Sequence, residues 1–391
     1  AGGNGTPERH RATHLPMNRS RIAILALVFL GCTYTADDTP LEDEDLASAQ
    51  LAVTFETSYT IAASTAPLVN PYVVTIATSG SDTTGNGSAS LPFKTLQKAH
   101  DHLQTYFATN PHRDVDVQVM PGGAYLNQRV DWRFALTSPY RIRIGPPANA
   151  ATKPVFVGCT AWPVSNTHTQ CATGTVPFIN LWAPRVAIEN LHIQYYWLAI
   201  SAHSGATNGR ITQNFFYYIG NNHASSMVRG ETAISVLSSY YLIQGNQFRF
   251  LRNHGTDEDK YLHALYFKDR NAHHNEASYN NFEYVEGDPV KHRNYTTYNK
   301  VNYNNFYYTG IRCAGILDSP DSGECASWGN EARYNKYERL EDGTLASARD
   351  GFELERVVTG STTGACAPPT GVTQRNATSG NVVVTNMQDP N

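Results

Sequence analysis

The chain has 391 residues, enough for one elongated domain or two compact ones. Its formal net charge is −4 and only 16% of its residues are charged, so the overall composition gives no indication of nucleic-acid binding. The 23 tyrosines and the frequent asparagines favour a secreted β protein that handles sugars.

The first residues carry a targeting signal rather than part of the fold. A basic segment, Met17–Arg21, precedes an apolar run, Ile22–Leu30, which is too short to span a bilayer comfortably. With Cys32 behind it, the segment resembles a bacterial lipoprotein signal, in which Cys32 is lipidated. Ordinary secretory cleavage is the alternative. We therefore expect a secreted or cell-surface bacterial protein that meets the membrane only through this anchor. Residues 1–32 form the leader, and residues 33–70 form a flexible acidic tether.

Cysteine usage also fits an exported protein. Cys159 and Cys171 lie 12 residues apart, as do Cys313 and Cys325, and each pair flanks a polar loop. This spacing predicts two local disulfides and leaves Cys366 over. Metal binding by these cysteines is the weaker interpretation, because no CxxC spacing accompanies them.

Residues 71–391 read as one β domain. A short strand near Val73 is followed by a turn and by a helix that ends near Tyr106, and further strands are expected at Val115 and Arg141. The segments SGSD…PFKTLQKA, VQVMPGGAY and RIRIGPPANAATKPVFVG, in this order, resemble the N-terminal cap and first coils of parallel β-helix proteins of the pectate-lyase-like superfamily. The resemblance implies an all-β fold, a right-handed parallel β-helix (solenoid) with an N-terminal capping helix.

An internal repeat supports the solenoid. Asn275–Phe282 (NEASYNNF) returns as Asn299–Phe306 (NKVNYNNF), 24 residues later. Related segments are centred on Asn190, Asn214, Asn246 and Asn335. We expect these asparagines to stack as a structural ladder at the corners of the coils, with their amides bonded to the turn backbone.

The same repeat contains a block of basic residues. Lys268 and Arg270 are matched 23 residues later by Lys291 and Arg293. Strand parity points all four side chains outward, with Lys268 expected over Lys291 and Arg270 over Arg293. Like charges stacked in this way are unfavourable unless an anion binds between them. The block therefore predicts a site for an acidic polymer, and a solvated surface balanced by nearby carboxylates is the alternative.

Proteins of this fold with outward lysine and arginine side chains resemble polysaccharide lyases. The resemblance implies β-elimination on a uronate polymer, which requires a neutralised carboxylate, a base for the C5 proton and an acid for the leaving O4. Lys291 is the first choice as base and Lys268 the second, because neighbouring cations disfavour the charged form of a lysine. Arg293 suits the carboxylate, and His263 is a further acid or base. The expected substrate-binding residues are Arg270, Tyr266, Arg252 and His254.

Calcium is a candidate cofactor on the same resemblance, because many related lyases use it to hold the carboxylate, and the alternative is that no cofactor is used. The candidate ligands are Asp288, Glu286, Asp257 and Asp259. The alternative interpretation is a solvated loop at 257–259 and an ordinary coil turn at 286–289.

Two other functions remain open. One is a non-catalytic surface adhesin or glycan-binding β-helix, in which the basic block only holds the polymer. The other is a hydrolase that uses Asp269 and Asp288, and it is weaker because Asp269 is expected to face inward. In each case we expect a monomer whose partner is an acidic polysaccharide.

Overall fold

The computed structural model describes residues 66–158, 177–220, 230–253, 262–285, 287–307, 309, 316–318, 324–338, 352–353, 362–372 and 376–384. The predicted signal, Cys32 and most of the predicted tether lie outside these ranges, as do Cys159, Cys171 and Cys313. What was predicted for the signal, for the tether and for the pair Cys159–Cys171 stays a prediction. No helix among the described residues is long and apolar enough to cross a membrane.

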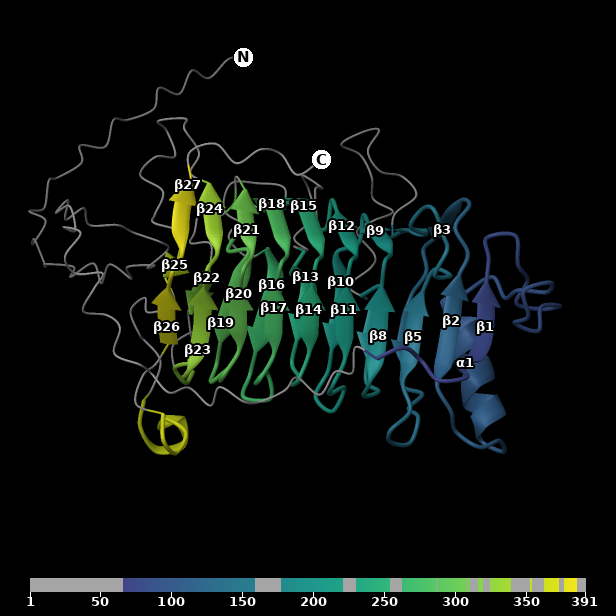
Figure 1. The fold of residues 1–391 in the computed structure, drawn as a ribbon, viewed down its shortest axis with the longest axis horizontal. Helices are drawn as coiled ribbons and strands as arrows, with labels where there is room; N and C mark the ends of the chain where they lie inside the picture. The colour runs from purple at the N-terminus through teal and green to yellow at the C-terminus, as the bar shows by residue number, and fades with distance from the viewer. Residues whose placement is uncertain are drawn as a thin grey trace, which may run out of the picture. The chain divides into compact units, whose positions relative to one another are not determined.

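The described strands form three parallel sheets, and successive coils add one strand to each sheet (Figure 1). The first sheet contains β1 (Tyr72–Ile76), β2 (Val115–Val119), β5 (Ile142–Gly145), β8 (Val186–Glu189), β11 (Arg210–Thr212), β14 (Leu242–Gln244), β17 (Glu276–Ser278), β20 (Lys300–Asn302), β23 (Asn330–Arg333) and β26 (Asn376–Ser379). The second sheet contains β3 (Ala124–Leu126), β6 (Val155–Val157), β9 (His192–Gln194), β12 (Phe215–Tyr217), β15 (Gln247–Leu251), β18 (Asn281–Val285), β21 (Asn305–Tyr307), β24 (Lys336–Glu338) and β27 (Val382–Val384). The third sheet contains β4 (Val130–Trp132), β7 (Ile179–Leu181), β10 (Leu198–Ala202), β13 (Thr232–Val236), β16 (His263–Lys268), β19 (Val290–Arg293), β22 (Ile316–Asp318) and β25 (Phe352–Glu353). The expected all-β parallel β-helix is confirmed.

The core between the sheets repeats from coil to coil. Phe216, Phe248, Phe282 and Phe306 of the second sheet are fully buried, and their ring centroids lie 4.9, 5.0 and 4.7 Å apart in sequence. Each buried side chain of this size contributes about 1.5–3 kcal/mol. The recurring phenylalanine of the sequence repeat is therefore a core position.

The predicted asparagine ladder is present. Its first run joins Asn214, Asn246, Asn280, Asn304, Asn335 and Asn381, each amide donating to the side-chain oxygen of the next at 3.0–3.1 Å. A second run joins Asn275, Asn299 and Asn330. The amides also donate to backbone carbonyls, so these buried polar groups are satisfied. Asn190 is not part of the ladder, because it occupies a left-handed corner and its oxygen accepts from the Lys153 ammonium.

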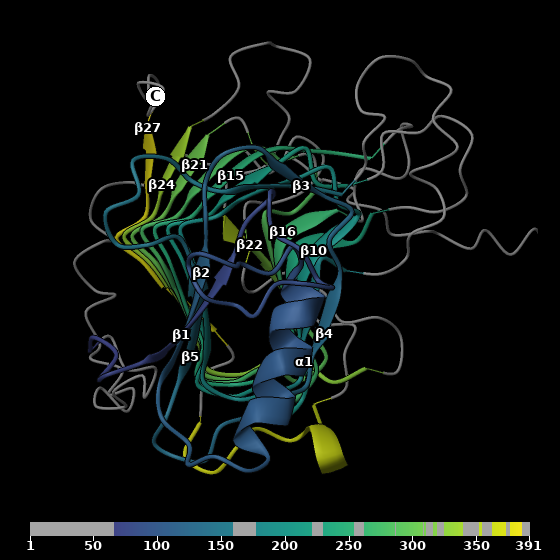
Figure 2. The ribbon, with the colours of Figure 1, turned by 90° about the vertical axis from the view of Figure 1, so that its right-hand side faces the viewer.

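The capping helix is α1 (Leu96–Phe107), which lies across the end of the coils beside β1 and β4 (Figure 2). Thr95 begins the helix, since its hydroxyl accepts from the backbone N–H of Lys98 at 3.1 Å. Leu96, Leu103 and Phe107 are buried against the coils. The helix thereby covers the apolar surface and the unpaired strand edges that the first coil exposes.

The disulfide predicted between Cys313 and Cys325 is wrong. Cys325 is bonded to Cys366, 41 residues away, in the 3₁₀ helix η3 (Gly364–Cys366). The Cα atoms of the two cysteines are 5.0 Å apart. Short sequence spacing suggested a local loop, but coiling brings residues of distant segments to the same corner. Trp328 supports the corner by donating to the carbonyl of Cys366 at 3.2 Å.

Candidate functional site on the third sheet

Lys268, Lys291 and Arg293 of the basic block are on the outer side of the third sheet, and Arg270 follows the end of β16, but the register differs from the predicted one. Lys268 pairs with Arg293, and Tyr266 pairs with Lys291. Lys268 therefore does not lie over Lys291, and Arg270 does not lie over Arg293. The predicted in-and-out alternation holds, because the error is two residues.

Corner residues explain the shifted register. Asp269 and Asn294 both have left-handed backbone conformations, with φ of 69° and 58°, and end matching strands. The backbone N–H of Asp269 donates to the carbonyl of Arg293, and the Asn294 amide donates to the Asp269 carboxylate at 2.6 Å. Asp269 is half-buried at this corner, and its left-handed backbone ends the strand alternation from which an inward orientation was predicted.

Arg293 connects three coils. Its guanidinium binds both carboxylate oxygens of Glu324, at 2.7 and 2.8 Å, and donates to the phenol oxygen of Tyr266 at 3.2 Å. Burial alone lowers the pKa of this guanidinium, but the bonds to Glu324 and Tyr266 outweigh burial and raise it, so the charge is permanent. Sequence reasoning missed Glu324. Its only signal was its position beside Cys325, whose true partner was not predicted.

His263 lies behind this cluster and not on its surface. Only 3% of the residue is exposed, and its ring centroid is 5.2 Å from that of Tyr266. Nδ1 lies 2.9 Å from the backbone carbonyl of Asp288, so Nδ1 carries the hydrogen that it donates. Burial, and then the charges of Lys291 and Arg293, hold its pKa well below the ordinary value. The imidazole is therefore neutral at pH 7.

Of the remaining basic candidates, Lys268 is the one that the structure places near Tyr266. The Lys268 ammonium lies 5.9 Å from the Tyr266 ring centroid, and the exposed Arg270 guanidinium lies 5.2 Å from the Tyr295 ring. Arg252, at the end of β15, is also exposed, while His254 lies outside the described residues.

Only one of the four proposed calcium ligands, Asp288, lies within the described residues. Asp288 is 1% exposed, and Glu286, Asp257 and Asp259 lie outside the described ranges. Within those ranges, no group of three or more His, Cys, Asp or Glu side chains could hold a metal ion. The calcium site therefore stays a prediction, and we derive no step through calcium.

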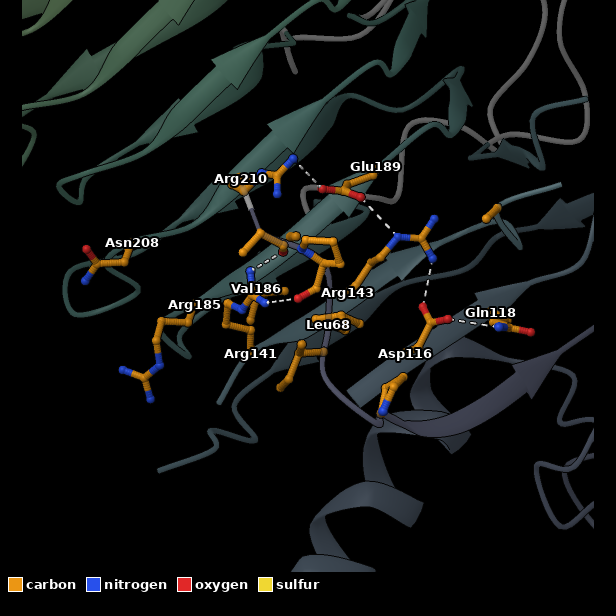
Figure 3. Close-up of a pocket in the computed structure, with 16 residues that line it drawn as sticks. Leu68, Asp116, Gln118, Arg141, Arg143, Arg185, Val186, Glu189, Asn208 and Arg210 are labelled. Atoms are coloured by element: carbon orange, nitrogen blue, oxygen red, sulfur yellow. Dashed lines mark hydrogen bonds and ion pairs between the residues drawn. The ribbon is translucent and has the colours of Figure 1, made fainter. Parts of the chain in front are cut away.

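A separate cavity of about 410 Å³ lies over the first sheet and is rich in arginine (Figure 3). Arg143 bridges Asp116 at 2.7 Å and Glu189 at 3.0 Å, and Glu189 also binds Arg210 at 3.0 Å. Arg141 donates to the carbonyls of residues 66 and 67. These side chains neutralise one another and hold the segment before β1 against the sheet. We therefore assign this network a structural role.

Comparison with known proteins identifies no family. The chain matches no protein-family model and no curated protein sequence. An alginate lyase from Paenibacillus sp. aligns with a TM-score of 0.47 and 14% identity, over 74% of this chain and 87% of its own. A rhamnogalacturonan lyase aligns with a TM-score of 0.45 and 12% identity, over 69% of each chain. A lacto-N-biosidase from Eubacterium ramulus aligns with a TM-score of 0.38 and 12% identity, over 68% of this chain and 56% of its own. These likenesses concern the course of the backbone and assign no activity to this chain.

Proposed function

We propose that the protein is a polysaccharide lyase that cleaves an acidic, uronate-containing polysaccharide by β-elimination on the outer face of the third sheet. The observation that supports this proposal is the pairing of Lys291 with Tyr266, whose phenol oxygen accepts from Arg293. An amine and a phenol thus stand on adjacent strands, about 4.8 Å apart in backbone spacing. They suit the two proton transfers that β-elimination needs.

In this proposal the side-chain nitrogen of Lys291 accepts the proton from C5 of the uronate. The electrons of the C5–H bond form the C4=C5 double bond while the C4–O4 bond breaks. Tyr266 gives its phenolic proton to O4. The phenolate that remains faces the guanidinium of Arg293, which stabilises the negative charge at the moment it develops.

In this arrangement Lys268 and Arg270 bind the substrate carboxylate. All three nitrogens of the Arg293 guanidinium donate to protein groups: Nε and Nη2 to Glu324, and Nη1 to Tyr266. Arg293 therefore serves as a positioning residue, in place of the carboxylate-binding role expected from the sequence. Arg252 and His254 remain proposed substrate contacts, and His263 supports Tyr266 from behind.

The second candidate is a glycan-binding β-helix without catalysis. The specific observation in its favour is the bidentate pair between Arg293 and Glu324, which fixes one cation of the block in the protein's own structure. In that case Lys268, Arg270 and Lys291 hold the polymer as separate charges, and binding weakens steadily with salt.

The experiment that separates these candidates is ultraviolet absorbance with pectate, alginate, hyaluronan, chondroitin and heparosan, each with calcium and with chelator. β-Elimination produces a conjugated double bond, so absorbance rises on a substrate. We expect the rise to disappear in Lys291→Ala and to persist in Lys300→Ala, a matched lysine on the first sheet. A flat trace of the wild type on all five polymers overturns the lyase proposal. Loss of the rise in chelator assigns a calcium requirement.

A further inference from the structure

A column of side chains at the ends of the first strands of the third sheet is not explained by the proposed reaction. Arg133 follows β4, Trp182 follows β7 and His203 follows β10, and backbone hydrogen bonds align these positions from coil to coil. The Arg133 guanidinium carbon lies 4.6 Å from the centroid of the Trp182 ring. The rings of Trp182 and His203 stack at 3.7 Å with an interplanar angle of 3°.

A second column beside the first fixes how His203 is oriented. Asp131, Asn180 and Ser201 are register partners on β4, β7 and β10. The Asn180 amide nitrogen lies 2.7 Å from Asp131 Oδ1, and because a carboxylate only accepts, this nitrogen faces Asp131. The amide oxygen then faces His203 Nε2 at 3.0 Å, so Nε2 carries the hydrogen.

This orientation excludes a nucleophilic serine. Ser201 Oγ lies 3.4 Å from the same Nε2 of His203, which already donates to Asn180 and therefore offers Ser201 no lone pair. Burial is the main cause that lowers the pKa of His203, so the ring is neutral at pH 7. The cluster therefore resembles a Ser–His–Asp catalytic triad in composition only. We consider it as a binding site and not as a catalytic one.

Of the two exposed members of the cluster, Arg133 is held by the capping helix α1. The backbone N–H of Arg133 donates to Nε2 of His100 in α1 at 3.2 Å. The Arg133 side chain is 58% exposed and its Nη2 contacts Asp131 at 3.2 Å, a surface pair that is weak in water. A guanidinium has five N–H donors, so a ligand carboxylate can bind it beside Asp131. Trp182 is 37% exposed and offers an apolar edge next to this charge.

The cluster and the candidate site lie on the same side of the third sheet, joined by register partners of which Ser201 and Ser235 are buried. Ser201 pairs with Ser235, Ser235 with Tyr266, and Tyr266 with Lys291. Four strand spacings separate β7 from β19, a distance of about 19 Å. No residue at the outer positions Arg133, Trp182, His203, Leu237 and Lys268 is buried.

We propose that Arg133 and Trp182, supported by Asp131, Asn180 and His203, form a distal binding region for an anionic polysaccharide that lies along the third sheet and reaches Lys291. The identity of the polymer rests on the proposed function. Arg133 binds a carboxylate, and the exposed edge of Trp182 contacts the apolar side of a sugar ring. A monosaccharide cannot contact both regions across about 19 Å, whereas a polymer can.

The test compares the wild type with Arg133→Gln, with Trp182→Leu and with the double variant. Arg113→Gln is the matched control, because Arg113 is exposed and lies 5.2 Å from the Tyr72 ring, away from the third sheet. Binding is measured by affinity electrophoresis in gels that contain alginate or polygalacturonate. We expect the double variant to bind at least about tenfold more weakly, because a loss of about 1.4 kcal/mol over the two contacts corresponds to this factor. Arg113→Gln should bind as the wild type does.

The results separate this proposal from the lyase proposal. Wild-type binding in the double variant, or a wild type that neither polymer retards, overturns the distal region. On a cleaved polymer we expect the double variant to raise KM and leave kcat nearly unchanged, and an unchanged KM overturns the distal region while the lyase assignment stands. Binding that depends on Arg133 without any turnover supports the distal region and overturns the lyase assignment. Circular dichroism and Tm of each variant exclude loss of folding as the cause.

Discussion

Arg293 donates to the phenol oxygen of Tyr266 in the preceding coil at 3.2 Å, while Glu324 from the following coil binds the guanidinium on its other side. Three coils thus meet at one arginine. The position of the proposed proton donor depends on a carboxylate 58 residues further along the chain, which in turn is attached to the Cys325–Cys366 corner.

The first prediction concerns the phenol of Tyr266. Tyr266→Phe removes only the O–H, so we expect the fold to persist and kcat to fall by about 10²-fold or more, the usual contribution of a positioned acid. The ultraviolet absorbance of the conjugated double bond gives kcat, and Tm shows whether the variant is as stable as the wild type. Tyr279→Phe, at an exposed corner, is the control. Wild-type kcat in Tyr266→Phe excludes this residue as the acid.

The second prediction concerns the support of Arg293. Glu324→Gln keeps the shape of the side chain but removes the charge that compensates a partly buried guanidinium. We expect the free energy of unfolding to decrease by about 2 kcal/mol. We also expect kcat to fall, because Arg293 no longer fixes Tyr266.

The matched control for this variant is Glu331→Gln. Glu331 pairs with Arg333 at 3.4 Å on the first sheet, with comparable exposure. It should lower stability without lowering kcat. Equal losses of kcat in the two variants argue against a positioning role for Glu324.

Sequence periodicity was enough to predict the coils but not their register. The identity between Lys268-x-Arg270 and Lys291-x-Arg293 favoured a shift of 23 residues, whereas the strands pair with a shift of 25. Register is set by the left-handed corners, Asp269 and Asn294, and a two-residue error leaves the buried faces unchanged. Hydrophobic alternation therefore could not reveal it.

The distal cluster was missed for a different reason. Its strands, β7 and β10, are short, and its members Asn180, Trp182 and His203 belong to no repeated basic motif. A binding site can be inferred from them only when the coils place them beside Arg133. The Cys325–Cys366 bond escaped prediction in the same way, because its two cysteines are neighbours across coils and not along the chain.

The third prediction concerns the asparagine ladder. Asn280→Ala removes the oxygen that accepts from both the backbone N–H and the side-chain amide of Asn246, at 2.9 and 3.0 Å. Leaving these buried donors without an acceptor costs about 2–5 kcal/mol. Chemical unfolding measures the loss. Asn281→Ala, at a half-buried neighbour, should cost much less, and similar losses in the two variants contradict the assignment of the ladder as a main support.

The fourth prediction concerns acid stability and His292, a buried core histidine that stacks on Phe267 at 5.0 Å. Burial lowers its pKa to about 3, whereas the unfolded chain binds this proton near pH 6.5. The neutral ring is therefore fully compatible with folding above pH 6.5. Below that pH the unfolded state binds a proton at this residue, whereas the folded state does not. The free energy of unfolding therefore decreases until about pH 3.

The slope attributable to this one residue is up to about 1.4 kcal/mol per pH unit. His292→Phe keeps a planar ring and removes the titration, so the decrease in Tm between pH 7 and pH 4.5 should be smaller than in the wild type. His263, His192 and His274 also have lowered pKa values from burial and contribute to the decrease that remains. The two proteins should show the same dependence between pH 7 and 8. Equal decreases in acid mean that His292 takes up its proton without unfolding, and the core around Phe267 then admits a charge.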